Sequence, residues 1–208
     1  ERLISWIDDW EGLGPDDSNG PVSHNQSEQE GLPKRHVVAY TNTHAHFDHS
    51  GMIPELLKHW KVPFWLHEGD HHLQSTAQKS ASRWGFTVPP PATPTDEWQD
   101  GQTYDFSGIT IEVRHAPGHS LGSVCLIIPD DSGPSHAFVG DVLFAGGVGR
   151  TDLPDSGGSW PLLKRSIEEK LFTLPDETIV YPGHGPKTTI GAEKVSNPFV
   201  GELAQSFT

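Results

Sequence analysis

Short apolar runs recur along this chain, and polar or amphipathic stretches separate them. The run at residues 37–40 is apolar throughout, as in a buried strand, whereas the run at 109–113 alternates apolar and polar side chains. Strands are predicted at residues 37–40, 62–67, 109–113, 123–128, 137–141 and 178–181. Since amphipathic stretches separate several of these strands, the pattern predicts a layered α/β fold.

Helices are predicted where apolar side chains recur at helical spacing. In residues 160–171, Leu163 and Ile167 lie on an apolar face that opposes lysine, arginine and glutamate side chains. Further helices are predicted at residues 1–10, 51–60 and 68–78. Residues 14–33 are rich in Gly, Pro, Ser and acidic side chains, which predicts a flexible loop. We therefore expect one domain spanning residues 1–208.

Size and charge restrict the classes of function. The 208 residues are enough for one domain with a substantial hydrophobic core. The chain has 28 acidic and 14 basic residues, for a formal net charge of −14 at pH 7. Because nucleic-acid binding needs a basic surface, this balance argues against a nucleic-acid partner. The sequence leaves the oligomeric state open.

Several features favour a cytoplasmic location. No apolar run reaches the length of a membrane span, and the opening residues lack the basic-then-apolar order of a signal peptide. The single cysteine, Cys125, lies in an apolar run and is expected to be an inert buried thiol. One cysteine allows no internal disulfide, which fits a reducing compartment. We expect no membrane partner.

The most distinctive stretch, residues 43–49, concentrates metal-binding side chains directly after the first apolar run. In an extended segment His44 and His46 point the same way and can bind one cation. A turn can then bring Asp48 and His49 back to the same place, where a second cation could bind. Imidazole and carboxylate groups are the ligands that zinc and iron accept, so this spacing predicts a metalloenzyme.

Three further candidate ligands follow predicted strands. His119, Asp141 and His184 each come directly after a glycine at the end of an apolar run or just beyond it. Glycine allows the sharp turns and close backbone approach that a metal cluster requires. One such residue alone would be an ordinary turn former, but together with residues 43–49 they complete a set of ligands.

This ordered set is similar to the signature of the metallo-β-lactamase superfamily, His-x-His-x-Asp-His followed by a later His, an Asp and a final His. Residues 140–154 and 181–191 resemble the stretches around the bridging aspartate and the last histidine of bacterial single-domain glyoxalase II-like hydrolases. The similarity runs from about residue 37 to about residue 200. It implies an αββα sandwich with the metals at one edge.

The resemblance also implies a division of the ligands between two divalent metal ions, zinc in the first instance and iron or manganese as alternatives. One ion would be held by His44, His46 and His119, the other by Asp48, His49 and His184, and Asp141 would bridge them. Such a pair can share a hydroxide that attacks a carbonyl carbon. The catalytic carboxylates Asp48 and Asp141 would also offset part of the positive charge.

The implied substrate is a small thioester such as S-lactoylglutathione. Arg150 occupies a position where two-domain glyoxalase II enzymes carry a basic residue, so its guanidinium could bind a substrate carboxylate. Alternatively, an Arg150–Asp152 contact would only shape the loop. Lys187 is a second candidate for anion binding, with an ordinary solvated lysine as the alternative. His115 precedes the loop of His119 and could support it through a hydrogen bond.

Other functions remain open on the same residues. A persulfide dioxygenase would use one iron on His44, His119 and Asp141, and a lactone or ester hydrolase would use the same two-metal centre. A degenerate fold serving as a binding module is the alternative that is not an enzyme. Relatives usually begin with strands that build the first sheet, and nothing before residue 37 has that pattern. We therefore expect the usual first strands to be missing, through truncation or as a real departure.

Overall fold

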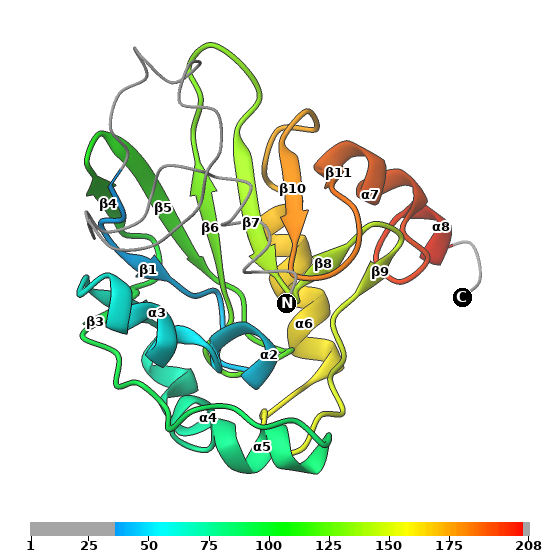
Figure 1. The fold of residues 1–208 in the computed structure, drawn as a ribbon. Coiled ribbons are helices and arrows are strands. Elements are labelled where there is room, and N and C mark those ends of the chain that lie inside the picture. Colours follow the sequence, from blue (N-terminus) through cyan, green and yellow to red (C-terminus); the bar gives the residue numbers. More distant parts are fainter. Residues whose placement is uncertain (1–35, 206–208) are drawn as a thin grey trace, which may run out of the picture.

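Two β-sheets lie face to face at the centre of the molecule, and helices cover the outer face of each (Figure 1). The structure is a computed structural model that describes residues 36–205. Its four layers are the αββα sandwich that the resemblance implies. The predictions for residues 1–10 and 14–33, and for strands before residue 37, fall outside the described residues.

The first sheet is small and parallel. Its strands are β1 (Tyr40–Thr41), β2 (Phe64–Leu66) and β3 (Asp96–Glu97), in the order β1-β2-β3. The connections between them hold the helices α2 (Phe47–Ser50), α3 (Ile53–His59), α4 (His71–Ser75) and α5 (Ala77–Arg83), and the 3-10 turn η1 (Glu68–Asp70). These connections place all the helices of the first half on one side of the molecule (Figure 1).

The second sheet has six strands in the order β11-β10-β7-β6-β5-β4. They are β4 (Thr103–Phe106), β5 (Ile109–His115), β6 (Val124–Ile128), β7 (His136–Gly140), β10 (Ile179–Pro182) and β11 (Thr188–Thr189). Neighbours are antiparallel except β7 and β10, which are parallel. The remaining elements are the hairpin β8 (Leu143–Phe144) and β9 (Gly147–Val148), α6 (Trp160–Ser166), the π-helical turn η2 (Ile167–Leu171), α7 (Ile190–Ser196) and α8 (Glu202–Gln205).

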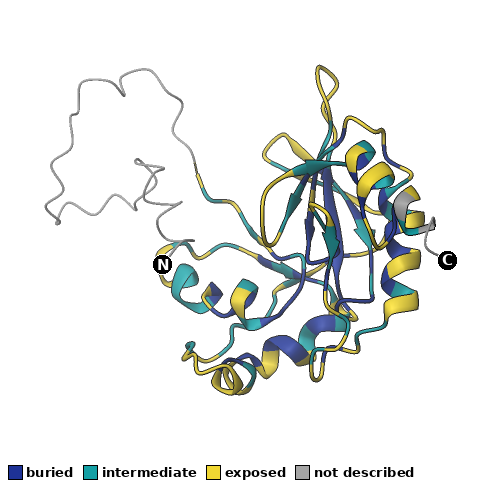
Figure 2. Cartoon of the chain, turned by 90° about the vertical axis from the view of Figure 1, so that its right-hand side faces the viewer, coloured by how far each residue is buried: buried dark blue, intermediate teal, exposed yellow. Residues whose placement is uncertain are grey.

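Alternation along the strands separates the layers. On β6, Val124 and Leu126 pack in the core between the sheets, whereas Cys125 and Ile127 pack in the core that contains α6 and η2. Residues two apart on a strand share a face, so one strand contributes to both cores. Burial of an Ile, Leu or Val side chain contributes about 1.5–3 kcal/mol. Figure 2 shows the result, with buried residues along the strands and exposed residues on the outer sides of the helices.

Two sequence predictions are wrong in detail. Residues 37–40 are not a buried strand: pairing begins only at Tyr40, and Val38 is 40% exposed. The cause is that β1, among the described residues, pairs with β2 alone and at two residues only. The single helix predicted at 68–78 is instead η1, α4 and α5, interrupted at Thr76, whose backbone N–H and side-chain hydroxyl both donate to the His72 carbonyl.

The other helices and strands predicted within the described residues agree with the structure. The helix expected at 160–171 is α6 followed by η2, and the Phe172 N–H donates to the Ile167 carbonyl to close the π-helical turn. Cys125 is fully buried, and burial raises the pKa of its thiol to about 12, as expected of an inert thiol. Across residues 36–205, no helix has the length and apolar character needed to span a membrane.

Candidate metal centre

Four strand ends deliver the predicted ligands to one edge of the two sheets. His44 and His46 follow β1, and α2 then carries the next two candidates. His119 lies between β5 and β6, Asp141 directly follows β7, and His184 follows β10. Because β7 and β10 are parallel, their carboxyl ends meet at the same edge. The fold thus brings together all seven residues that the sequence suggested as ligands.

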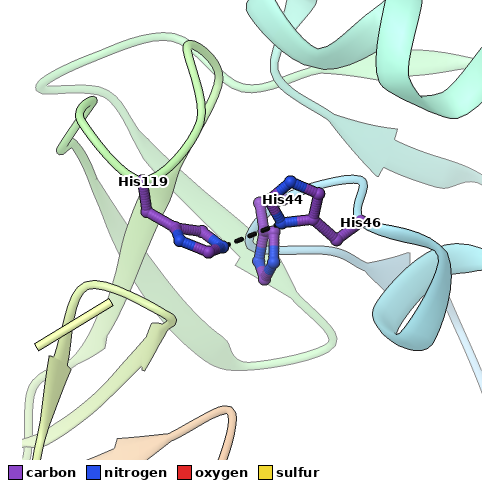
Figure 3. Close-up of side chains that lie close together, drawn as sticks. All are labelled: His44, His46 and His119. Carbon is purple, nitrogen blue, oxygen red and sulfur yellow. Dashed lines mark hydrogen bonds between the residues drawn. The ribbon is translucent and has the colours of Figure 1, made fainter. Parts of the chain in front are cut away.

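Three buried histidines form the first cluster. Figure 3 shows these side chains pointing toward one another from the two loops that carry them. His44, His46 and His119 offer ring nitrogens that all lie within 4.8 Å of one another. The closest pair is His46 Nδ1 and His119 Nε2, at 2.8 Å. Three imidazoles converging in this way are a common ligand set for zinc and other transition metals.

A backbone contact fixes the tautomer of His119. Its Nδ1 lies 2.7 Å from the Arg150 carbonyl oxygen, and because a carbonyl can only accept, Nδ1 carries the hydrogen. Burial lowers the pKa of His119, which keeps the ring neutral. Nε2 is therefore left with a lone pair aimed at the cluster. A hydrogen bond of this kind is the usual support of a metal-binding histidine.

The second cluster is more open to solvent. His49 Nε2 lies 3.2 Å from His184 Nε2, and His184 Nε2 lies 3.3 Å from Asp48 Oδ2. The side chains of His184 and Asp48 are roughly half exposed. An exposed group of two imidazoles and one carboxylate can hold a second cation that substrate is able to reach.

Asp141 lies between the clusters. Its Oδ2 is 3.6 Å from His119 Nε2 and 3.4 Å from His184 Nε2, while Oδ1 is 3.5 Å from His49 Nε2. Burial raises the pKa of this carboxyl to about 6, because a low-dielectric environment disfavours its charged form. Cations on either side would favour the ionised form. Among the described residues, Asp141 is thus the carboxylate that lies within 3.6 Å of histidines from both clusters.

Burial keeps the histidines in the form that binds metals. It lowers the pKa of His44 well below the ordinary value, and lowers the pKa of His46 to about 3 and that of His49 to about 4. Neighbouring imidazoles add to the effect because their positive charges would repel. At neutral pH these rings are uncharged and their lone pairs are available.

Unpartnered polar atoms also fit bound cations. Among the described residues, His44 Nε2, His46 Nε2 and Asp141 Oδ1 are buried without a hydrogen-bond partner. An unpaired buried polar group costs about 1–3 kcal/mol, so such groups are rare unless an ion or water satisfies them. A cation held by His44 Nε2 and Asp141 Oδ1 would remove two of these costs. The residues present therefore fit a metal centre.

Glycines make room for this arrangement. A Cβ on Gly183 would collide with Asp141 Oδ1 and lie 2.6 Å from His49 Cε1. Gly140 has a φ of +50°, a conformation that glycine adopts without strain. The glycine before Asp141 and the glycine before His184 are thus required by close approach, as the sequence suggested for these turns.

Sequence analysis missed Asp70, which is completely buried behind the first cluster. Its carboxylate accepts hydrogen bonds from Ala45 N at 2.9 Å, Ser120 Oγ at 2.8 Å and Gly122 N at 2.6 Å. Asp70 therefore ties the loop of His44 and His46 to the loop of His119. A lone aspartate in a predicted helix gave no signal of this role. The predicted support by His115 is present, since its Nε2–H donates to the Leu121 carbonyl at 2.8 Å.

A cavity of about 380 Å³ opens onto both clusters. Ligand pockets commonly have volumes of this order. Arg150 lines the cavity, and its guanidinium also pairs with both carboxylate oxygens of Asp152, at 2.9 and 3.0 Å. Lys187 is exposed just before β11 and does not line this cavity. The residues on α5 and beyond that line it, including Arg83, were not among the sequence candidates.

The αββα layers and the histidine clusters at their edge define a metal-binding hydrolase fold. The chain belongs to the metallo-β-lactamase superfamily, whose sequence model matches residues 13–184. It is 40% identical to the hydroxyacylglutathione hydrolase GloC of Haemophilus influenzae over 161 residues, which are 76% of this chain and 73% of GloC.

Solved structures agree with this assignment. TTHA1623 in a di-iron-bound form is 40% identical, with a TM-score of 0.70, and the match covers 78% of this chain and 77% of that one. BLEG-1, a B3 metallo-β-lactamase, is 38% identical with a TM-score of 0.71, covering 78% of this chain and 77% of its own. The fold class inferred from the sequence is confirmed.

Proposed function

We propose that this protein is a two-metal hydrolase that cleaves a small thioester such as S-lactoylglutathione. The observation that carries the proposal is Asp141, which lies within 3.6 Å of histidines from both clusters at the end of one cavity. Similarity to GloC, a hydroxyacylglutathione hydrolase, supports the choice of substrate. The di-iron form of TTHA1623 supports two metals, with zinc, iron and manganese all compatible with these ligands.

The proposed ligand sets follow the clusters. One metal is assigned to His44, His46 and His119, the other to Asp48, His49 and His184, with Asp141 shared. Divalent ions bound in such pairs supply a water-derived nucleophile at neutral pH and stabilise developing negative charge. Asp48 and Asp141 lower the net charge of the centre. The Arg150 carbonyl accepts a hydrogen bond from His119 and so orients this proposed ligand. The loop that contains Arg150 therefore both supports the metal centre and lines the cavity.

The arginine of this loop is proposed to bind an anionic group of the substrate. The Arg150 guanidinium is exposed, and Asp152, with which it pairs, is exposed as well. Exposed ion pairs contribute little to stability, so the guanidinium can exchange Asp152 for a substrate carboxylate at small cost. Lys187 remains a second candidate that lies outside the cavity wall.

Alternative activities predict different metal contents or substrates. A persulfide dioxygenase with one iron on His44, His119 and Asp141 would leave the second cluster without a role. Similarity to BLEG-1 makes a β-lactam a further candidate substrate, and lactones or other esters present the same carbonyl chemistry. A binding module that is not an enzyme would show no turnover at all.

The test is a thioester assay combined with metal counting. Metal-replete protein should contain about two metals per chain and hydrolyse S-lactoylglutathione, and removal of the metals by a chelator should abolish turnover. Re-addition of Zn²⁺ should restore it. One iron per chain with oxygen consumption on a persulfide would instead favour the dioxygenase. Turnover of a β-lactam but of no thioester would transfer the proposal to that substrate.

A variant pair makes the test specific to the shared carboxylate. Asp141→Ala should lose at least about 100-fold in kcat/KM and bind about one metal, because a ligand common to both sites is removed. Asp131→Ala, an exposed aspartate in the β6–β7 turn, should behave like the wild type. Two metals and full turnover in Asp141→Ala would refute the assignment.

A further inference from the structure

Two aromatic side chains stand exposed at the cavity that opens onto the metal clusters. Trp84 and Phe86 follow directly after α5, and they are 53% and 60% exposed. Both line the cavity together with His46 and Asp141. Most of the large apolar side chains of the described residues are at least partly buried, so two exposed aromatic rings in one cavity point to a binding role.

The aromatic wall lies close to the proposed reaction centre. The Phe86 ring is 5.6 Å from the ring of Phe47, which also lines the cavity and lies in sequence between His46 and Asp48. Phe47 and Phe86 therefore form one apolar surface in the cavity onto which both clusters open. Phe144, Leu153 and Pro154 supply further apolar surface to the cavity.

Cationic groups border the same wall. Arg83 lines the cavity immediately before Trp84, and its guanidinium pairs with exposed Asp155 at 2.8 Å. Arg150 also lines the cavity. On a chain with a net charge of −14, two arginines at one cavity favour a substrate that is itself anionic. The cavity thus combines an apolar wall with two sites for negative charge.

We propose that Trp84 and Phe86 form an acyl subsite, so that the substrate is an anionic thioester whose acyl group carries a bulky apolar substituent next to the carbonyl. This inference rests on the proposed hydrolase function. A glutathione-like thiol portion is polar and charged and matches the arginines. The apolar wall therefore matches the acyl portion, which lies nearest the metals. A lactoyl group carries only a methyl there and would leave most of the aromatic surface uncovered.

Two matched pairs of compounds test the subsite. S-mandeloylglutathione and S-lactoylglutathione differ only in the group on the carbon next to the thioester carbonyl, which is phenyl in the first and methyl in the second. We expect kcat/KM of metal-replete protein to be at least about 10-fold higher for the mandeloyl ester, as burial of a ring against apolar side chains predicts. S-benzylglutathione, which cannot be hydrolysed, should likewise bind at least about 10-fold more tightly than S-methylglutathione by calorimetry.

Variants separate this inference from the hydrolase proposal. The double substitution Trp84→Ala, Phe86→Ala should reduce both ratios to about 2 or less. Phe199→Ala removes another exposed aromatic, 50% exposed and outside the cavity lining, and should change neither ratio.

The two proposals fail differently. Hydrolysis of S-lactoylglutathione with no preference for either aromatic compound would overturn the acyl subsite and leave the hydrolase intact. A tryptophan-dependent preference for S-benzylglutathione without turnover of any thioester would support the subsite and refute the thioesterase. Preferences that persist in the double variant would also overturn the subsite.

Discussion

Asp70 shows how one buried residue can organise a metal centre without contacting the ring nitrogens of the proposed histidine ligands. Its three hydrogen-bond partners are 25, 50 and 52 residues away in sequence. Burial raises the pKa of this carboxyl, and the three hydrogen bonds counter that effect by stabilising the charge. Two loops that would otherwise move independently are joined behind the first histidine cluster. We regard Asp70 as a positioning residue.

Substitution of Asp70 should therefore weaken metal binding. Asp70→Ala leaves the buried N–H groups of Ala45 and Gly122 without an acceptor, so we expect a loss of about 2–4 kcal/mol in the free energy of unfolding. Metal affinity of the folded protein should fall about 10-fold or more, because the ligand loops lose their common anchor. Urea unfolding and competition with a chromophoric chelator would measure the two effects.

A second variant distinguishes positioning from general stability. Asp70→Asn keeps one oxygen acceptor and should recover part of the metal affinity. If Asp70→Ala is less stable but its folded fraction binds metal as tightly as the wild type, Asp70 has a structural role only.

Single residues differ in how far sequence can identify them. His44 and His46 were found because strand geometry places residues two apart on one side, and Asp141 because it ends an apolar run after glycine. Asp70 and the aromatic pair Trp84 and Phe86 have no such local pattern. Their partners come from distant segments, so only the folded chain identifies them.

At the scale of elements, the ends of the strands position the residues of the site. β7 and β10 run in parallel, with Pro182 opposite Gly140, and the Gly183 N–H donates to the Gly140 carbonyl at 2.8 Å. This hydrogen bond closes the sheet directly beside Asp141. The sheet therefore ends at the metal centre, and the ligands lie on short turns supported by rigid strands.

Gly118, in the turn before His119, packs this loop against α6. Its φ is +135°, and a Cβ would collide with the backbone of Leu163 on α6. Gly118→Ala should therefore lower the free energy of unfolding by about 2–4 kcal/mol and reduce metal affinity, because the adjacent ligand must shift.

Gly101 offers a matched control for this prediction. Its φ is +73°, but a Cβ would meet nothing within 4 Å. Gly101→Ala should cost only about 1 kcal/mol, the strain of the left-handed conformation alone. Urea unfolding of both variants makes the comparison, and equal losses would show that packing against α6 is unimportant.

Element prediction succeeded where a strand or helix is held by neighbours on both sides. The runs at 109–113, 123–128 and 137–141 became β5, β6 and β7, which are interior strands of the larger sheet. The prediction was wrong at residues 37–40, because β1 has two paired residues and, in the part of the chain that the structure describes, one neighbour, which does not fix the segment before it. Propensity alone does not report which strands are edges.

At the scale of the whole molecule, the layered fold could be predicted because it follows from alternation and strand order. The cavity could not, since its walls come from α2, from α5 and the segment after it, from β8, and from the loop after β9. The contact between the two sheets was also invisible in the sequence. It includes a stacked pair of histidines, His67 after β2 and His115 at the end of β5, with ring centroids 4.1 Å apart and planes at 10°.

This stacked pair makes stability depend on pH. Burial lowers the pKa of His67 to about 4, and the charge that His115 would carry adds to the effect. In the unfolded chain the imidazole takes up a proton near its ordinary pKa of about 6.5. Between these two values the unfolded state binds more protons than the folded state, so the free energy of unfolding falls as the pH falls.

We expect His67 to lower the free energy of unfolding by about 1 kcal/mol between pH 7 and pH 5, because solvent screening of this partly exposed ring reduces the effect of its depressed pKa. The variant His67→Asn does not titrate. Its side-chain oxygen can still accept the hydrogen bond that the Gly69 N–H donates to His67 Nδ1 at 3.1 Å.

Urea unfolding of metal-replete wild type and variant at pH 7, 6 and 5 should show the two stabilities converging as the pH falls. His59→Asn, an exposed histidine on α3, should run parallel to the wild type. The other buried histidines titrate equally in wild type and variant, so only convergence of the two free energies of unfolding identifies the effect of His67. Parallel dependence of the two free energies on pH would show that the stacked pair does not set the pH dependence.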